Sequence, residues 1–356
     1  METDQAQAAI GQAAEILRAG GLVALPTETV YGLGANALDA AAVARIFEAK
    51  RRPSWDPIIV HIAGPVHQNP MLEQLVTKYP PVVRGLMEEF WPGPLTLLLP
   101  RSEAVPDVVT AGRPLVGIRM PAHPVAFEVI RQAGVPIAAP SANVFSHISP
   151  TTAAHVLEDL DGKIDAVVDA GPTRHGVEST VLDPTRNPML IYRPGAITAQ
   201  QIRQVAGHVD YFEERMLPAD PGRPALPSPG VGLRHYAPHA RLILVEGSVE
   251  GSVEGSLAEL PARLADAAGP YAKQRLGVML PAELAHIQFE PPLRGAVEFP
   301  WGHWNAPEEL AEKLYAGLRA LDASGCTVIL CPLPQAAGVG EAIRDRLRKA
   351  AYSARD

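Results

Sequence analysis

The sequence predicts two α/β domains, the second smaller than the first. The chain has 356 residues, of which 47% are hydrophobic, enough for two cores of ordinary size. Segments with helical spacing alternate with short apolar runs typical of buried strands. This alternation is lost between residues 207 and 240. We therefore expect a first domain over 1–206, a linker over 207–240 and a second domain over 241–356.

In the first domain, glycine and aspartate mark where helices end and begin. Gly20 and Gly21 terminate the first helix, and Asp39 is placed to cap the second. Helices are expected over residues 5–19, 40–49, 82–90, 123–134, 151–160 and 198–206. Strands are expected over residues 22–25, 58–62, 95–99, 115–119, 136–139, 165–169, 177–182 and 189–193.

Proline and glycine dominate the segment between the two domains. Residues 217–224 and 227–230 are too rich in proline to form regular structure. The sequence Val-Glu-Gly-Ser then occurs three times between Val245 and Ser256, and its glycines favour a flexible surface loop. In the second domain, strands are expected over 241–245, 275–280 and 326–330, and helices over 257–268, 306–322 and 339–351.

Charge and cysteine content exclude several classes of protein. The 31 lysines and arginines against 39 acidic residues give a net charge of −8, which argues against a surface that grips nucleic acid or anionic membrane throughout. Cys326 and Cys331 are too few for a disulfide scaffold or a Cys₄ zinc site, and we expect both to be buried thiols. No apolar run reaches the roughly 20 residues that cross a bilayer, and the first residues lack a signal-peptide pattern. We expect a soluble, cytoplasmic protein.

Three hydroxyl groups alternate within the stretch Pro26–Gly34. If the stretch is extended, Thr27, Thr29 and Tyr31 point to one face, which suits a small polar ligand such as an amino acid. The alternative is that these residues are present for their β propensity.

Three cations, Lys50, Arg51 and Arg52, follow the second helix, and Pro53 fixes the turn after them. We expect Lys50 and Arg52 to be exposed and aimed at one point, as binding of a polyphosphate requires. A solvated helix C-terminus is the alternative, because cations there meet the negative end of the helix dipole. His61, in the apolar strand that follows, is by itself more typical of a core histidine than of a ligand contact.

Polar residues also follow a strand further along the chain. Ser141 and Asn143 come after the strand over 136–139, and Ser149 precedes the next helix. Ligands bind at the carboxyl ends of strands in open α/β sheets. As the alternative, Ser149 or Thr151 is simply the N-cap of that helix.

Together and in their order, these segments resemble the threonylcarbamoyl-AMP synthase family, also called YrdC-like, in its long two-domain form. The matching strings are PTETVYGLG (26–34), KRRP (50–53), PIIVHI (57–62), VGIRMPAHP (116–124), APSAN (139–143), SPT (149–151), GVESTVLD (176–183), YRPG (192–195) and SPGVGLRHYAP (228–238). They cover residues 10–240 densely and the C-terminal domain loosely. The resemblance implies a YrdC-like twisted mixed sheet with flanking helices, followed by a smaller Rossmann-like α/β domain.

The resemblance also implies an activity. The family joins L-threonine, bicarbonate and ATP into L-threonylcarbamoyladenylate and releases pyrophosphate. A partner transferase complex then modifies the tRNA adenosine beside the anticodon. We expect a nucleotidyltransferase with these substrates, with Mg²⁺ carried by ATP rather than by protein side chains. Direct binding of tRNA is left open.

The resemblance assigns one group of residues to ATP. In catalysis, Lys50 and Arg52 would neutralise the phosphates. The whole ATP group is Lys50, Arg52, Asp56, Ser141, Asn143, Ser149, Arg193, His235 and Tyr236. The last two lie in the linker and would close over the site as a lid that excludes water.

A second group of residues is assigned to L-threonine by the same resemblance. It consists of Thr29, His61, Arg119, Ala139 and Ser179. Arg119 would pair with the substrate carboxylate, and Ala139 would contribute through its backbone.

Three positions depart from the usual family pattern. Asp56 stands where asparagine is usual, Phe145 and Ser146 replace serine and glycine, and Gly232 replaces a lysine. We expect Asp56 to weaken ATP binding unless its carboxylate meets Mg²⁺ or Arg52.

Two alternative functions fit parts of the pattern. A YrdC-like RNA-binding module would place Lys50, Arg51 and Arg52 on a phosphate backbone, but the net charge of −8 and the 5% of aromatic residues disfavour it. Use of carbamoyl phosphate, as in hydrogenase maturation factors, goes with zinc-finger cysteines and an acylphosphatase domain, neither of which is visible in this sequence.

Overall fold

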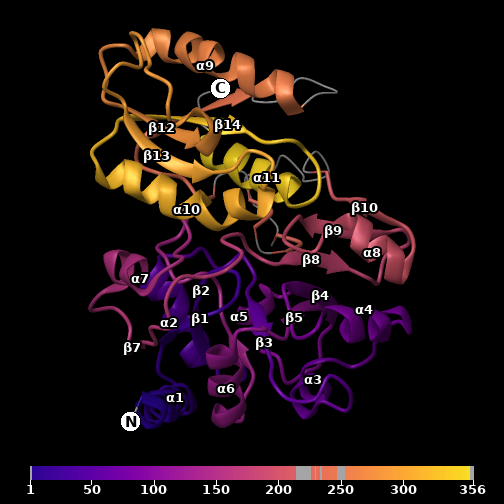
Figure 1. Ribbon diagram of the computed structural model, residues 1–356. Coiled ribbons are helices and arrows are strands. Elements are labelled where there is room, and N and C mark those ends of the chain that lie inside the picture. Colours follow the sequence, from indigo (N-terminus) through magenta and orange to yellow (C-terminus); the bar gives the residue numbers. More distant parts are fainter. Residues whose placement is uncertain (1, 214–225, 229, 233–234, 247–252, 353–356) are drawn as a thin grey trace. The chain divides into compact units, whose positions relative to one another are not determined.

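The computed structural model describes residues 2–213, 226–228, 230–232, 235–246 and 253–352 (Figure 1). The chain forms two compact units. The first comprises residues 1–145, 149–174 and 178–232, and the second comprises residues 146–148, 175–177 and 233–356.

A ten-stranded sheet forms the centre of the first unit, with the strand order β10-β9-β8-β4-β5-β3-β6-β2-β1-β7. The strands are β1 Val23–Pro26, β2 Tyr31–Asn36, β3 Ile59–His61, β4 Leu95–Pro100, β5 Leu115–Arg119, β6 Ile137–Ala138, β7 Ala166–Val167, β8 Thr180–Asp183, β9 Met189–Arg193 and β10 Val209–Tyr211. Strand β5 runs parallel to β3 and antiparallel to β4. The mixed sheet predicted from the sequence is confirmed.

Helices cover both faces of this sheet. They are α1 Glu2–Arg18, α2 Ala40–Lys50, α3 Pro70–Leu75, α4 Val82–Phe90, α5 Asp107–Thr110, α6 Pro124–Ala133, α7 Ala153–Leu160 and α8 Ala199–Ala206. In β1, Val23 and Leu25 pack in one core cluster with residues of α1 and α6, whereas Ala24 packs in another with residues of α2. Because successive side chains of a strand point to opposite faces, the sheet is buried on both sides.

The start of α2 follows its sequence signal. The Asp39 side chain accepts hydrogen bonds from the backbone N–H groups of Ala41 and Ala42, as an N-cap does. The predicted cap is therefore confirmed, and it sets where the helix that carries Lys50 begins.

Strand β2 is not predicted by the sequence pattern, because Gly32 and Gly34 weaken a strand. Both glycines provide space between neighbouring strands. A Cβ at Gly34 would lie 2.9 Å from Cγ2 of Ile137, and one at Gly32 would lie 3.3 Å from Cβ of Ala139. The missing side chains let β6 approach β2 closely.

A short strand, β10, lies among the described residues of the segment between the predicted domains. Strand β10 pairs in parallel with β9, although no regular structure is expected after residue 207. Residues 217–224, predicted to be irregular, lie outside the described residues.

A four-stranded parallel sheet forms the second unit, in the order β11-β14-β12-β13. Its elements are β11 Arg241–Glu246, α9 Val253–Ala268, β12 Leu276–Pro281, β13 Val297–Gly302, α10 Pro307–Ala323, β14 Val328–Leu333 and α11 Val339–Ala351. Helix α9 lies on one face of this sheet, and α10 and α11 lie on the other (Figure 1). This is the expected Rossmann-like arrangement. The pattern misses β13 because it contains Pro300, which is tolerated in an edge strand.

Two sequence-based expectations for the second unit have different outcomes. Cys326 and Cys331 are buried, as expected. The third Val-Glu-Gly-Ser repeat, residues 253–256, begins α9, so the prediction of a loop is wrong there, while residues 247–252 lie outside the described residues. None of the described helices has the length and apolar character needed to cross a membrane.

Candidate functional site

A turn at the end of α2 carries the cations of the KRRP segment. Lys50 is the last residue of the helix, and Arg51 follows with a left-handed φ of 51°. The N–H of Arg51 bonds to the carbonyl of Glu48 at 3.1 Å, and that of Arg52 bonds to the carbonyl of Phe47 at 2.9 Å. These bonds reverse the chain and fix the directions in which Lys50 and Arg52 leave it.

Lys50 is buried against the segment that follows β6. It is 1% exposed, and its Nζ donates to the carbonyl oxygens of Ser141, at 2.5 Å, and of Asn143. Burial lowers the pKa of Lys50 well below its ordinary value, and the charge of Arg52 acts in the same direction. The expectation of an exposed Lys50 is wrong, because backbone carbonyls rather than water surround its ammonium group.

Ser141 and Asn143 contact Lys50 through their backbones. The Asn143 side-chain amide donates to the carbonyl of Val144 at 2.8 Å. Ser141 also forms an isolated antiparallel bridge with Gly32 of β2. The structure therefore brings the predicted phosphate-binding residues Lys50, Ser141 and Asn143 together.

Arg52 pairs with Asp56 inside the same turn. Their Nη2 and Oδ2 atoms are 2.9 Å apart, and 6% of the Arg52 side chain and 0% of the Asp56 side chain are exposed. Arg52 also donates to the carbonyls of Asp56 and Pro57. Burial raises the pKa of Asp56, and the charges of Arg52, Lys50 and Arg193 oppose this. The expectation of an exposed Arg52 side chain is therefore wrong. Asp56 does meet Arg52, one of the two cations expected to make its carboxylate compatible with ATP binding.

Phe145 joins this turn to the segment after β6. Its N–H donates to the carbonyl of Lys50 at 2.8 Å. Its ring centroid lies 5.9 Å from Cζ of Arg52, and the Trp55 ring meets it edge-on at 6.1 Å. This departure from the family pattern thus adds a cation–π contact to a site cation.

Arg119, at the end of β5, is enclosed by acceptors. Its Nη2 lies 2.6 Å from Oε1 of Glu28, its Nη1 donates to Oγ1 of Thr29 at 2.9 Å, and its Nε donates to the carbonyl of Gly93 at 3.2 Å. Burial raises the pKa of Glu28, but the charge and hydrogen bond of Arg119, together with backbone hydrogen bonds, outweigh burial, so that the pKa lies below its ordinary value. Sequence reasoning missed Glu28. The signal that could have found this residue is a single carboxylate between Thr27 and Thr29.

His61 lies beside Arg119, because β3 and β5 run parallel with these two residues in register. Burial lowers the pKa of His61 to about 3, and the charge of Arg119 adds to this, so the ring is neutral at pH 7. Its buried Nδ1 has no hydrogen-bond partner within the described part of the chain. The ring is buried as a core histidine is, yet it lies next to the predicted threonine-binding arginine.

Ser179 and Arg193 form a further cluster with Thr96 of β4. Arg193 donates from Nε to the carbonyl of Ser179 and from Nη2 to its Oγ, both at 3.0 Å. The Oγ of Ser179 lies 2.8 Å from Oγ1 of Thr96, another residue that sequence reasoning missed. Because Arg193 is predicted for ATP and Ser179 for L-threonine, the two hydrogen bonds from Arg193 to Ser179 join the two predicted groups.

Ser149 is fully buried and donates to Oε1 of Glu178 at 2.6 Å. The N-cap of α7 is Thr152, whose side chain accepts from the N–H of His155. The alternative that Ser149 or Thr151 caps this helix is therefore wrong. Glu178 is a second carboxylate that the sequence analysis did not assign.

The hydroxyls of Thr27, Thr29 and Tyr31 do not form a row. Residues 27–30 turn, with the N–H groups of Thr29 and Val30 donating to Oγ1 of Thr27. The Tyr31 hydroxyl instead donates to the carbonyl of Gly171 at 2.8 Å. Thr29 stays with the predicted threonine group through Arg119. Ala139, also of that group, donates its N–H to the carbonyl of Ile59 at 2.9 Å.

His235 and Tyr236 belong to the second unit. Tyr236 has a left-handed φ of 64°, and its ring stacks on Tyr315 with centroids 5.7 Å apart. The Cζ atom of Arg346 lies 5.4 Å from the Tyr236 ring, and the N–H of His235 donates to the carbonyl of Lys349. Both residues are thus packed against α10 and α11, and their assignment to ATP stays a prediction.

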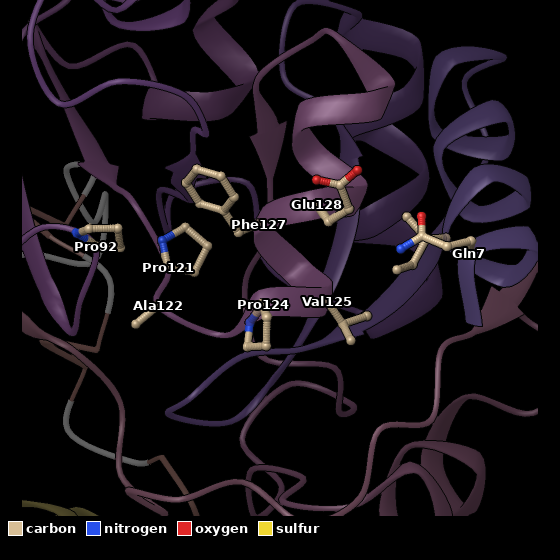
Figure 2. A pocket seen from close by; sticks show the side chains of 9 residues that line it. Gln7, Pro92, Pro121, Ala122, Pro124, Val125, Phe127 and Glu128 are labelled. Atoms are coloured by element: carbon tan, nitrogen blue, oxygen red, sulfur yellow. The ribbon is translucent and has the colours of Figure 1, made fainter. Parts of the chain in front are cut away.

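A cavity of 520 Å³ lies in the first unit among α1, α6 and the segment after β5. Figure 2 shows Gln7 of α1 on one side and Pro92 and Pro121 on the other. It is lined by Gln7, Ile10, Pro92, Pro121, Ala122, Pro124, Val125, Phe127 and Glu128. None of the predicted site residues lines it, so this cavity is not the expected binding place of ATP.

Comparisons with known proteins agree with the motifs and the fold. The Sua5–YciO–YrdC family model, described as telomere recombination, matches residues 15–195. The model described as threonylcarbamoyl-AMP synthase, C-terminal domain, matches residues 197–352. The threonylcarbamoyl-AMP synthase of Pyrococcus abyssi is 42% identical over 340 residues, which cover 95% of this chain and 92% of the relative. The chain belongs to the threonylcarbamoyl-AMP synthase family.

Other members of the threonylcarbamoyl-AMP synthase family are similarly close. The Bacillus subtilis protein is 44% identical over 347 residues, 96% of this chain and 92% of the relative. The crystal structure of P. abyssi Sua5 complexed with L-threonine matches with a TM-score of 0.82 and 42% identity, covering 96% of this chain and 94% of that one. The family and the two-domain fold that the motifs implied are confirmed.

Proposed function

We propose that this chain is a threonylcarbamoyl-AMP synthase, a nucleotidyltransferase that forms L-threonylcarbamoyladenylate and pyrophosphate from L-threonine, bicarbonate and ATP. One observation carries the assignment of the site. The Lys50–Arg52 turn contacts the segment of Ser141 and Asn143, and Arg193, of the same predicted ATP group, bonds to Ser179 of the predicted L-threonine group. Members of the two predicted groups are therefore in direct contact.

The reaction requires no protein nucleophile. The threonine amine attacks the carbon of CO₂ derived from bicarbonate and loses a proton, which leaves a carbamate. A carbamate oxygen then attacks the α-phosphorus of ATP, the bond from that phosphorus to the bridging oxygen breaks, and pyrophosphate leaves. Catalysis therefore depends on positioning the reactants and on neutralising phosphate charge.

Lys50 and Arg52 neutralise the phosphates in this proposal. Lys50 is held by neutral carbonyls, and Arg52 is held by carbonyls and by the Asp56 carboxylate. A triphosphate offers further charged acceptors at the same turn. Asp56 acts at the ATP site through its ion pair with Arg52, in which its carboxylate competes with phosphate for the guanidinium. The remaining ATP contacts are assigned by family resemblance to Ser141, Asn143, Ser149, Arg193, His235 and Tyr236.

Arg119 binds the carboxylate of L-threonine. Each terminal guanidinium nitrogen carries two N–H groups, and Glu28 and Thr29 engage one nitrogen each, which leaves N–H groups for a substrate carboxylate. A neutral His61 supports this role, because an imidazolium would repel the neighbouring Arg119. The other threonine contacts are assigned to Thr29, Ser179 and the backbone of Ala139.

Mg²⁺ enters this site with ATP. Among the described residues, no three His, Cys, Asp or Glu side chains gather into a metal site. Two carboxylates beside the predicted groups, Asp56 and Glu28, are each paired with an arginine. The ion would therefore be held chiefly by the phosphates, whose charge it would help to neutralise.

The product passes to a tRNA threonylcarbamoyl transferase complex in the cytoplasm, since the adenylate serves to modify tRNA. In this proposal, His235 and Tyr236 exclude water that would hydrolyse the carbamate.

The decisive experiment supplies ATP, Mg²⁺ and ¹³C-bicarbonate together with one amino acid at a time. We expect pyrophosphate and a labelled adenylate, identified by mass, with L-threonine and not with L-valine or L-alanine. Binding of tRNA that weakens steeply with salt, without threonine-dependent ATP turnover, would instead support the RNA-binding alternative.

A further inference from the structure

Thr27 holds its hydroxyl proton in a fixed direction. Thr27 is buried, and its Oγ1 lies 2.6 Å from the carbonyl oxygen of Val30. A carbonyl oxygen can only accept, so the single hydroxyl proton of Thr27 points to it. Thr27 Oγ1 can act toward every other neighbour only as an acceptor.

This fixes the role of the next hydroxyl along the chain. The Oγ1 of Thr29 lies 2.8 Å from Oγ1 of Thr27. Two hydroxyl oxygens this close need a proton between them, and since Thr27 has no second proton, Thr29 is the donor in this pair. The N–H groups of Thr29 and Val30 share the acceptor sites of Thr27 Oγ1 at the longer distances of 3.2 and 3.3 Å. Arg119 Nη1 donates to Thr29 Oγ1 at 2.9 Å, which occupies one of its two lone pairs.

Thr29 therefore has one lone pair left and no proton to give. It is 1% exposed, and within the described residues its hydroxyl makes no hydrogen bond besides these two. A buried acceptor beside Arg119 requires a donor, and the amino acid substrate supplies two kinds, amino N–H and side-chain O–H.

We propose that Thr27 is a positioning residue that makes Thr29 a pure acceptor for a hydrogen-bond donor of L-threonine. This inference rests on the proposed function of the same site. Without the Thr27 hydroxyl, the Thr29 proton is free to rotate away from Thr27. The Thr29 proton can then point at the substrate, where it would repel the N–H or O–H group that the substrate presents.

The test compares Thr27→Val, which keeps the shape and removes the hydroxyl, with Thr27→Ser, which keeps the hydroxyl. For Thr27→Val we expect the KM for L-threonine to rise about tenfold, as loss of one buried hydrogen bond predicts, with kcat within about twofold. Thr27→Ser should resemble the unsubstituted chain. Thermal melts would establish that both variants are folded at the assay temperature.

A double-mutant cycle with Thr29→Val separates positioning from a merely structural effect. If Thr27 acts through Thr29, Thr27→Val should change the L-threonine affinity by less than about twofold once Thr29 is valine. Additive losses, or a Thr27→Val chain that binds L-threonine normally, would overturn the proposal.

Calorimetric titration with L-threonine in the absence of ATP keeps this test separate from the proposed reaction. A chain that binds L-threonine but forms no adenylate contradicts the proposed function, while the titration still measures the role of Thr27. Titration with L-2-aminobutyrate, which lacks the hydroxyl, identifies the donor. An equal loss of affinity for both ligands indicates the amino N–H, and a loss confined to L-threonine indicates the O–H. A chain that binds neither contradicts both proposals.

Discussion

The ammonium group of Lys50 lies 2.5 Å from the carbonyl oxygen of Ser141, a residue 91 positions further along the chain. A lysine this deeply buried has lost its hydration, so this carbonyl and that of Asn143 stabilise its charge. The contact ties the end of α2 to the segment after β6. It also places a cation where we propose that the ATP phosphates bind.

Lys50→Met should reduce pyrophosphate release by at least about 100-fold, because the phosphate charge loses a buried partner. Because Lys50 is buried rather than exposed, its substitution should also affect folding. Two carbonyls lose their donor, so urea unfolding should show a loss of about 1–3 kcal/mol. Arg51→Gln is the matched control, since it removes the exposed neighbouring cation, and its turnover should stay within about twofold. Normal turnover by a folded Lys50→Met chain would refute the phosphate role.

Asp56→Asn should lower the KM for ATP by about threefold. The carboxylate of Asp56 competes with phosphate for the Arg52 guanidinium, whereas an asparagine oxygen accepts a hydrogen bond without a charge. Initial rates of pyrophosphate release at varied ATP concentration measure this change, with kcat expected to stay unaltered. A rise in the KM would show that Asp56 serves ATP binding mainly by holding Arg52 in place.

The elements of the fold that could be predicted from the sequence are those whose signals lie within a few neighbouring residues. Asp39 caps α2 through N–H groups two and three residues away, so its sequence neighbourhood contains the whole signal. Strand β2 has no such signal. Its Gly34 is required by Ile137, a contact about a hundred residues distant that no periodicity encodes.

In the candidate site, too, some residues could be predicted from nearby sequence and some contacts could not. The order of the motifs pointed to Lys50 and Arg119, because both lie within contiguous strings. The burial of Lys50 was missed, since it depends on carbonyls beyond residue 140, and Glu28 was missed as the partner of Arg119, since the two residues lie far apart in the sequence. Family resemblance identifies positions, whereas the charges around them follow from long-range packing.

His61 should make the stability of the chain depend on acidity. Its pKa falls from 6.5 to about 3 on folding, so between these values the unfolded state binds more protons. Stability therefore rises with pH in this window and is lost as pH falls from about 6.5 toward 3. Between pH 7 and pH 4 the unsubstituted chain should lose about 3 kcal/mol more than His61→Gln, which cannot titrate. Urea unfolding at pH 7, 5.5 and 4 measures the difference, and parallel curves for the two chains would contradict it.

Glu28→Gln should make the stability of the chain depend on L-threonine. Arg119 and Glu28 are both buried, with 4% and 5% of their side chains exposed, so loss of the carboxylate leaves an uncompensated guanidinium. We expect a loss of about 3 kcal/mol, measured by urea unfolding. Glu15→Gln, the same change on the exposed face of α1, should have no such effect.

The carboxylate of L-threonine can replace the charge that Glu28→Gln removes. If Arg119 binds that carboxylate, saturating L-threonine should raise the Tm of Glu28→Gln more than that of the unsubstituted chain, because the substrate then supplies the only counter-charge. L-threoninamide has the same side chain and amine but no carboxylate, and it should give no such gain. An equal gain from both ligands would mean that the substrate carboxylate binds elsewhere and that the Glu28–Arg119 pair is purely structural.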